Sequence, residues 1–216
     1  MDITSRIPSK KYTPKRRVCA TLIDRGLPRP YFSRKAGARG ETMYQIVDHP
    51  LLKHKLTVLR NHKTDTKEFR ELASEITMLL TYEALSNLAV NVVPVETPLA
   101  VADGFAIADN IIVVPILRAG VGMLDAMLHL LPRASIGFVG LYGDPATKQP
   151  VEYYQKLPAP EGNDMVIMVD QMLATGGSIN ATICLLKKKG VTRIKVISIL
   201  AAPEGIAAVE GAHADV

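Results

Sequence analysis

The segment VDQMLATGGSIN, residues 169–180, combines one acidic residue with two adjacent glycines and a serine. Backbone at glycine can approach an anion closely, and a helix that begins there presents free N–H groups, so Gly176, Gly177 and Ser178 suggest a phosphate site. Asp170 ends the apolar run MVIMV, at the edge of a sheet where open α/β proteins usually bind ligands, and its carboxylate can accept hydrogen bonds from sugar hydroxyls. These residues predict a site for a sugar phosphate.

Two common nucleotide motifs do not fit this chain. The ATP-type P-loop requires a lysine directly after its last glycine, and ATGGSIN has none there. A dinucleotide fingerprint needs three glycines at GxGxxG spacing, and Gly120 with Gly122 in RAGVGMLD lacks the third. The spacing leaves one simpler alternative open, a tight strand-to-helix turn in which Ser178 caps the helix.

A second apolar run, IIVVPIL, leads into Arg118, Ala119 and Gly120. Arg118 is therefore expected at the same sheet edge as Asp170, beside a helix N-terminus, where a guanidinium can bind a diphosphate through two hydrogen bonds. The competing role for Arg118 is a structural ion pair. The acidic residue and the glycine loop at neighbouring strand ends favour the ligand.

The elements that would position these residues follow α/β order. From residue 111 onward, strand-like and helix-like segments come in the order IIVVPIL, GVGMLDAMLHLL, SIGFVGLY, MVIMVD, SINATICLLKKKG, IKVISILAA and EGIAAVE. The strand segments are apolar without alternation, as parallel strands covered on both faces are, so the sequence predicts a doubly wound parallel sheet flanked by helices. Upstream, Thr66 is expected to cap a long helix, and Gly190 after three lysines is expected to end another.

Composition places the chain in the globular class. At 216 residues and 48% hydrophobic content it can bury a sizeable core, as one domain with an appendage. No apolar run approaches 18 residues and the start has no apolar signal-peptide core, so we expect neither membrane insertion nor secretion, and the cytoplasm is the default. No metal site is predicted from Cys19 and Cys184, and Cys184 is interpreted as helix packing. No role is assigned to His49, His54 and His62.

The positive charge is concentrated at one end. Residues 1–42 hold 11 Lys and Arg against 3 Asp and Glu, whereas residues 43–216 carry a net charge of −3. With scattered proline and glycine and no apolar period, residues 1–42 are predicted to be a largely disordered basic extension. It could be a nucleic-acid-binding arm or a targeting peptide, but we favour a solvated tail or a start codon placed upstream of Met43.

Several longer segments closely resemble uracil phosphoribosyltransferases. They are VVPILRAGVGMLDAMLHLLP, VGLYGDPATKQPVEYYQKLP, VDQMLATGGS and AAPEGIAAVEGAH, in the order of that family, and the similarity spans residues 43–216. The ATGGS sequence after a strand and an acid is typical of phosphoribosyltransferases in general, while PILRAG and VEYYQKLP are typical of the uracil enzyme. The resemblance implies a phosphoribosyltransferase-type, Rossmann-like fold.

The resemblance also implies a reaction and a set of site residues. Uracil and 5-phosphoribosyl 1-diphosphate would give uridine monophosphate and diphosphate in pyrimidine salvage, with Mg²⁺ bound to the diphosphate substrate. In this reading Asp170 holds the ribose hydroxyls, Arg118 contacts the diphosphate, and the remaining binding residues are Gln171, Met172, Leu173, Ala174, Thr175, Gly176, Gly177 and Ser178. Family members commonly form dimers or tetramers and some bind GTP, so a homo-oligomer and GTP binding are implied as well.

Three departures from the family pattern bear on activity. Gly143 stands in GLYGDPATKQP where the family has an arginine that binds the phosphoribosyl substrate, and Gln171 stands where it usually has proline. The sequence ends at AHADV, where the family continues to a glycine-rich loop that reads the uracil edge, so we expect this chain to lack the uracil-recognition segment and to expose a sheet edge.

Three function hypotheses follow from these residues. The first is an active uracil phosphoribosyltransferase, a pentosyltransferase. The second is a non-catalytic truncated fragment that keeps the phosphate loop, and the third is a related RNA-binding regulator of pyrimidine metabolism that uses the basic extension. The enzyme is favoured, and nucleic-acid binding is not.

Overall fold

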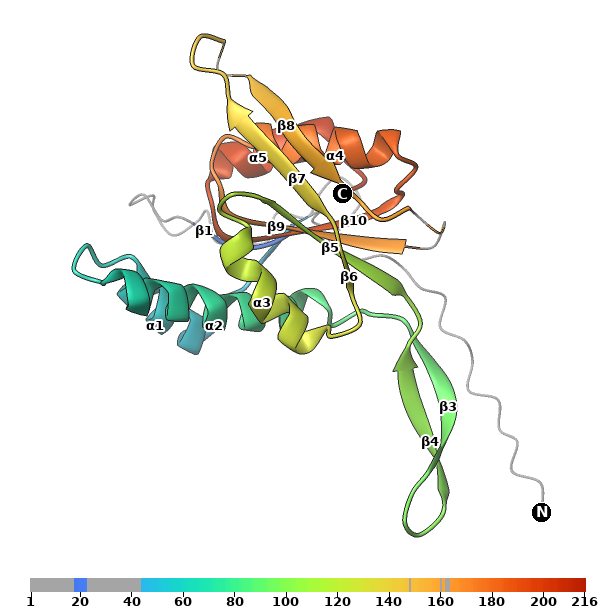
Figure 1. Cartoon of the computed structure of the whole chain (residues 1–216). Helices are drawn as coiled ribbons and strands as arrows, with labels where there is room; N and C mark the ends of the chain where they lie inside the picture. Colours follow the sequence, from blue (N-terminus) through green and yellow to red (C-terminus); the bar gives the residue numbers. More distant parts are fainter. Residues whose placement is uncertain (1–17, 23–43, 148, 160, 162–163) are drawn as a thin grey trace.

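The computed structural model of the chain describes residues 18–22, 44–147, 149–159, 161 and 164–216 (Figure 1). Its centre is an eight-stranded sheet in the order β2-β1-β10-β9-β5-β7-β8, with β6 also paired to β5. All of these pairings are parallel except that of β7 with β8. The strands are β1 (Val18–Leu22), β2 (Tyr44–Ile46), β5 (Asn110–Leu117), β6 (Ser135–Ile136), β7 (Phe138–Gly143), β8 (Pro150–Lys156), β9 (Asp164–Leu173) and β10 (Arg193–Ala201).

Helices cover both faces of this sheet, as the sequence predicted. One face packs against α1 (Pro50–Leu59), α2 (Thr66–Ala84) and α3 (Val121–Leu130), and the other against α4 (Gly177–Lys188) and α5 (Pro203–Ala212). Alternate residues of one strand pack on opposite faces of the sheet. Ile167 of β9 is buried with the α1–α3 group, whereas Val166 and Met168 are buried with α4 and α5. This two-sided burial explains why the central strands read as unbroken apolar runs.

Two helix termini test the predicted boundaries. Helix α2 does begin at Thr66, but its N-cap is Asp65, whose Oδ1 accepts a 2.8 Å hydrogen bond from the backbone N–H of Glu68. The expectation that Thr66 itself is the cap was therefore wrong by one residue, since the carboxylate of the preceding residue reaches the free N–H. At the end of α4, Gly190 has a φ of +87°, the left-handed conformation that confirms it as a helix stop.

The basic extension needs a correction at five residues. Residues 18–22, expected to lack regular structure, form strand β1, which lies between β10 and β2 with Val18 opposite Val196. The backbone of β1 therefore covers the side of β10 that faces away from β9. The other residues of the segment 1–42 lie outside the described residues.

Helix α1 and the hairpin of β3 and β4 were also not predicted. Helix α1 arises from HPLLKHKL, and its N-cap His49 accepts a 3.2 Å hydrogen bond on Nδ1 from the backbone N–H of Leu51. Strands β3 (Val90–Glu96) and β4 (Val101–Ile107) form a separate antiparallel hairpin that projects from the sheet (Figure 1). Its residues are largely exposed, so the hairpin adds little to the core.

No helix among the described residues is long and apolar enough to cross a membrane. Within the same residues there is no group of three or more His, Cys, Asp and Glu side chains that could hold a metal ion. The interpretation of Cys184 as a packing residue was wrong, because its side chain lies on the exposed side of α4, with Sγ 3.7 Å from Nε2 of His213.

Candidate active site

Asp170 lies where the sheet opens. The pairing of β5 with β9 ends at Pro115 and Val169, whereas β10 continues beside β9 with Ser198 opposite Asp170. Asp170 is thus the first residue of β9 without a partner on β5. The sequence suggested that Asp170 ends its strand, but β9 continues to Leu173. The alternation of β9 points its half-buried side chain to the face that α4 covers.

The environment of this carboxyl group favours its neutral form. Burial raises the pKa of Asp170 from 3.8 to about 6, although hydrogen bonds from the backbone N–H groups of Gln171 and Met172 act in the opposite direction. A carboxylate that accepts two backbone hydrogen bonds keeps further lone pairs for other donors. Asp170 is therefore oriented by its own strand and can still bind hydroxyl groups in front of it.

The loop after β9 forms an open helix N-terminus. Gly176 is the N-cap of α4 with a φ of +84°, and no side chain caps the helix. The first turn closes with a 2.8 Å hydrogen bond from the N–H of Asn180 to the carbonyl of Gly176, so the N–H groups of Gly177, Ser178 and Ile179 precede the first bonded one. Ser178 is exposed inside the first turn, which excludes the alternative that it caps the helix. Such an N-terminus attracts an anion.

Helix α5 packs against this loop and contacts its backbone. A Cβ atom on Gly205 would lie 2.4 Å from the carbonyl oxygen of Ala174, so only a glycine allows α5 to approach the loop this closely. The N–H of Ala202 donates to the carbonyl of Leu173 at 2.8 Å, and the side-chain amide of Asn180 donates to the carbonyl of Ala208 at 3.2 Å. These contacts fix the path of residues 173–176 before any ligand binds.

Arg118 follows β5 directly, after a cis peptide bond with Leu117. Its side chain is exposed, and no ion pair joins it to another residue in the part of the chain that the structure describes. Nothing in these residues therefore supports the structural ion pair. Arg118 borders an open cavity of about 770 Å³, which is lined by Leu117, Arg118, Ala119, Leu141, Tyr142 and Tyr153.

The other predicted binding residues fall into two groups. The backbone N–H groups of Gln171 and Met172 donate hydrogen bonds to the carboxyl group of Asp170. The side chain of Gln171 lies next to α3, since its Nε2 atom would be 2.8 Å from a Cβ atom on Gly122. Leu173 differs, because its side chain is only 1% exposed and belongs to the core. Its side chain therefore cannot bind a ligand, and the apolar character of leucine was the available signal for that.

Sequence reasoning missed two features of this region. Tyr142 and Tyr153 line the Arg118 cavity from β7 and β8, with ring centroids 6.3 Å apart, because the β7–β8 hairpin was not predicted. The role of Gly205 depends on a contact between segments about thirty residues apart, which no local pattern reveals. The sequence AAPEG, a proline at the start of a helix followed by a glycine inside it, was the only available hint.

Comparison with known proteins decides the family. The uracil phosphoribosyltransferase family matches residues 46–216 of the chain. The chain belongs to the uracil phosphoribosyltransferase family.

Individual relatives agree with this assignment. The uracil phosphoribosyltransferase of Dictyoglomus thermophilum is 53% identical over 81% of this chain and 84% of its own length. That of Alkaliphilus metalliredigens is 49% identical over 79% of this chain and 82% of its own length. The solved structure of the AQ2163 protein from Aquifex aeolicus superimposes with a TM-score of 0.71 at 32% identity, and covers 78% of this chain and 81% of that one. The phosphoribosyltransferase-type fold expected from the sequence is thereby confirmed.

Proposed function

We propose that this chain is a uracil phosphoribosyltransferase that converts uracil and 5-phosphoribosyl 1-diphosphate to uridine monophosphate and diphosphate in pyrimidine salvage. The observation that carries the proposal is membership of the family over residues 46–216. The open sheet edge between Arg118 and Asp170, beside an uncapped helix N-terminus, supports it with the donors and the carboxylate that a phosphoribosyl group requires.

The 5-phosphate is assigned to the loop Ala174–Ser178. The N–H groups of the first turn of α4 and the hydroxyl groups of Thr175 and Ser178 are the donors, and the positive end of the helix dipole adds to the attraction. Thr175 and Ser178 are both exposed, so their hydroxyl groups are accessible to a ligand. The contact of α5 with this loop means that the phosphate site forms without rearrangement.

The ribose hydroxyls are assigned to Asp170 and the diphosphate to Arg118. As the bond from ribose C1 to the diphosphate loosens, positive charge grows on the sugar ring and negative charge on the leaving group. The carboxylate of Asp170, at the ribose, would stabilise the positive charge on the sugar ring. The guanidinium of Arg118, at the diphosphate, would stabilise the negative charge on the leaving group. No nucleophilic side chain is needed, and we expect no covalent intermediate.

Mg²⁺ would enter this site bound to the diphosphate substrate. Mg²⁺ in phosphate-transfer enzymes keeps several waters and binds through one or two carboxylates together with substrate phosphates. Asp170 is assigned to the ribose hydroxyls and does not line the Arg118 cavity, so the diphosphate itself would hold the ion. When bound, Mg²⁺ would neutralise part of the charge on the diphosphate.

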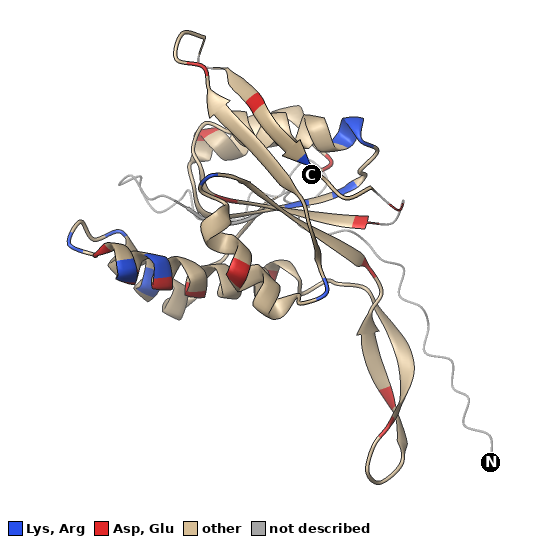
Figure 2. Cartoon of the chain, in the orientation of Figure 1, with Lys and Arg blue, Asp and Glu red and all other residues tan. Residues whose placement is uncertain are grey.

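The β3–β4 hairpin supports a homo-oligomer. Val90 lies opposite Ile107 and Val92 opposite Phe105, so these four exposed side chains share one face of the hairpin. Leu99 at the tip is 97% exposed. The hairpin carries acidic residues and no basic ones (Figure 2), and an isolated two-stranded hairpin is marginally stable in water. We propose that a second copy of the chain covers this apolar face.

A charge on that face tests the oligomer. Phe105→Glu should convert a dimer or tetramer to monomers in sedimentation velocity, because burial of the apolar face would then bury a carboxylate. Ala106→Glu places the same charge on the opposite face and should leave the mass unchanged. A monomeric wild-type chain would refute this part of the proposal.

Formation of radiolabelled uridine monophosphate, with Mg²⁺ present, tests the enzymatic proposal. Calorimetric binding of 5-phosphoribosyl 1-diphosphate should be measured in parallel. Arg118→Met should abolish turnover and weaken binding at least tenfold, since a charged hydrogen bond contributes about 1.5–3 kcal/mol. Arg133→Met removes an exposed arginine that does not line the cavity, and should change neither quantity.

The outcomes of this assay separate the hypotheses. Binding without turnover would support the non-catalytic fragment, and absence of both would refute the site. GTP binding and a cytoplasmic location stay predictions, which a titration with GTP during the assay and cell fractionation would check.

A further inference from the structure

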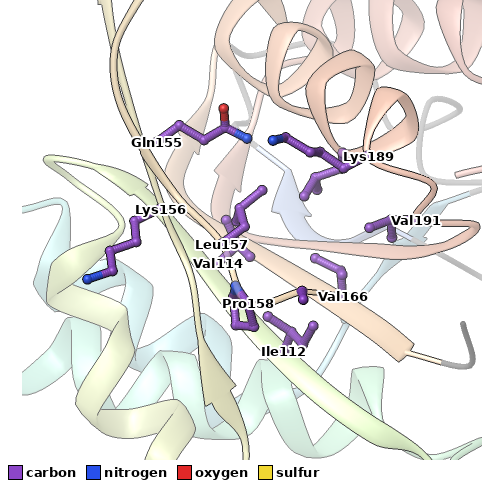
Figure 3. A pocket seen from close by; sticks show the side chains of 11 residues that line it. Ile112, Val114, Gln155, Lys156, Leu157, Pro158, Val166, Lys189 and Val191 are labelled. Carbon is purple, nitrogen blue, oxygen red and sulfur yellow. The ribbon is translucent and has the colours of Figure 1, made fainter. Parts of the chain in front are cut away.

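A second cavity lies under α4, on the same face of the sheet as Asp170 but further back along the strands (Figure 3). Its volume is about 350 Å³. Val166 on its wall precedes Asp170 by four residues in β9, which at about 3.3 Å per residue separates their Cα atoms by roughly 13 Å. The cavity is therefore distinct from the site at Arg118 and Asp170.

The wall of this cavity is mainly aliphatic. Side chains of β5, β9, α4 and the loop after α4 converge on it, and each of them is at most 8% exposed: Ile112, Val114, Val166, Leu186 and Val191. Leu157 and Pro158 close another side. A surface of this kind favours a compact apolar group of a ligand.

Two nitrogen donors meet at the opening. The Nε2 atom of Gln155 is buried and has no hydrogen-bond partner. Figure 3 shows this amide nitrogen and the amine of Lys189 pointing toward each other, while the amine of Lys156 points away. Lys189 forms no ion pair with another described residue. A buried amide donor without an acceptor is unfavourable, and a neighbouring ammonium group increases the need for an acceptor.

We propose that this cavity binds a small organic carboxylate with a compact apolar body. The apolar body lies against the aliphatic wall, and the two carboxylate oxygens accept hydrogen bonds from Nε2 of Gln155 and Nζ of Lys189. None of the described residues that line the cavity is acidic, so none of them repels the anion. An amine would be repelled by Lys189, and an alcohol would leave its charge unpaired.

The C-terminus of α4 lies near the cavity but does not prevent a carboxylate from binding there. Its partial negative charge is opposed by three consecutive lysines, of which Lys187 already pairs with Asp215 at 2.5 Å. Lys189 therefore remains available to the cavity at whose opening it lies.

Three probes of matched shape test the proposal on the full chain: cyclohexylacetate, 2-cyclohexylethanol and 2-cyclohexylethylammonium. Methyl NMR should show shifts for Val114, Val166 and Leu186 that saturate with cyclohexylacetate at millimolar concentration. The alcohol should bind at least tenfold more weakly and the amine should not bind. The methyl groups of Ile76 and Leu80, in the core on the other face, should not move.

Two variants test the donors. Lys189→Met should weaken binding of cyclohexylacetate at least tenfold, whereas Lys188→Met, which removes the neighbouring lysine outside the cavity, should stay within twofold. Gln155→Leu should weaken it as well. Unchanged affinity in Gln155→Leu would overturn the assignment, because it would mean that the amide turns its oxygen toward Lys189. Equal binding of all three probes, or no methyl shift at 10 mM, would overturn the site.

Discussion

A Cβ atom on Gly120 would lie 2.4 Å from the carbonyl oxygen of Val169, the residue directly before Asp170. The same atom would lie 2.7 Å from the backbone nitrogen of Ile116 and 2.9 Å from its carbonyl oxygen. Backbone atoms cannot rotate away as a flexible side chain can. The glycine is therefore what allows the loop that carries Arg118 to lie against the strand that carries Asp170.

Gly120→Ala should consequently separate the two strand ends. We expect a loss of about 1–3 kcal/mol of stability, typical of overpacking, and weaker binding of 5-phosphoribosyl 1-diphosphate. Gly122→Ala is the matched control, since its Cβ would meet only the end of the Gln171 side chain. Thermal denaturation and calorimetry measure both effects, and a Gly120→Ala protein as stable as the wild type would contradict the argument.

Gly176 and Gly190 form a second matched pair. Both have a positive φ, of +84° and +87°, at opposite ends of α4. Alanine at either position should lower stability by about 1–2 kcal/mol, because the left-handed conformation is unfavourable for residues with a Cβ atom. Only Gly176→Ala should also weaken phosphate binding, since it distorts the loop. Equal substrate affinity in the two variants would show that this loop does not bind the substrate.

Asp170→Asn should stabilise the protein while it weakens substrate binding. The pKa of Asp170 is raised from 3.8 to about 6, so the folded state holds the proton more tightly than the unfolded chain. Ionised Asp170 therefore lowers stability above pH 6, by up to about 3 kcal/mol, and this effect disappears as the pH falls toward 3.8. The melting temperature of Asp170→Asn should exceed that of the wild type at pH 8 by several degrees, and by much less at pH 4.5. A lower melting temperature at pH 8 would count against a desolvated carboxylate.

Binding of 5-phosphoribosyl 1-diphosphate should weaken in acid. Hydroxyl groups donate to the ionised carboxylate of Asp170, and at pH 5 only about one tenth of a group with a pKa near 6 is ionised. The dissociation constant should rise about tenfold between pH 7.5 and pH 5. Titration of the substrate contributes separately, and Asp170→Asn measures that part alone. Identical pH profiles for the two proteins would exclude Asp170 as the group that titrates.

Gly143→Arg should strengthen substrate binding. A Cβ atom at Gly143 has no neighbour within 4 Å, so the arginine that the family carries there has room in this chain. A new guanidinium next to Tyr142, at the edge of the Arg118 cavity, should improve affinity about tenfold through charged hydrogen bonds. Gly143→Met supplies bulk without charge and should have no such effect. If Gly143→Arg binds no better than Gly143→Met, position 143 does not reach the diphosphate.

Local patterns were sufficient for the central elements. Unbroken apolar runs such as IIVVPIL indicated strands buried on both faces, and the three lysines before Gly190 marked a helix end. Strand ends in a parallel sheet meet at one edge, so the sequence also predicted neighbouring strands for Arg118 and Asp170, and β5, which Arg118 follows, does pair with β9. The end of β5 at Leu117 was predicted in this way, whereas β9 continues past Asp170 to Leu173.

Features that depend on distant contacts could not be predicted in the same way. Gly205 is needed because α5 touches the backbone of Ala174, and Tyr153 lines a cavity because β8 folds back on β7. The hairpin β3–β4 has little burial pattern of its own, so no periodicity marked it. Strand β1 was missed because five residues, surrounded by basic ones, pair with a strand at the other end of the sequence.

The position of β1 also constrains the order in which the protein can form. Val18 pairs with Val196, so the sheet joins segments near the two ends of the sequence, and such contacts close slowly because the intervening chain must first be ordered. During synthesis β1 and β2 leave the ribosome long before β10 exists. They can pair with each other early, but the edge that will meet β10 stays open until the last quarter of the chain has been made, and nascent chains are most prone to mispairing in that interval.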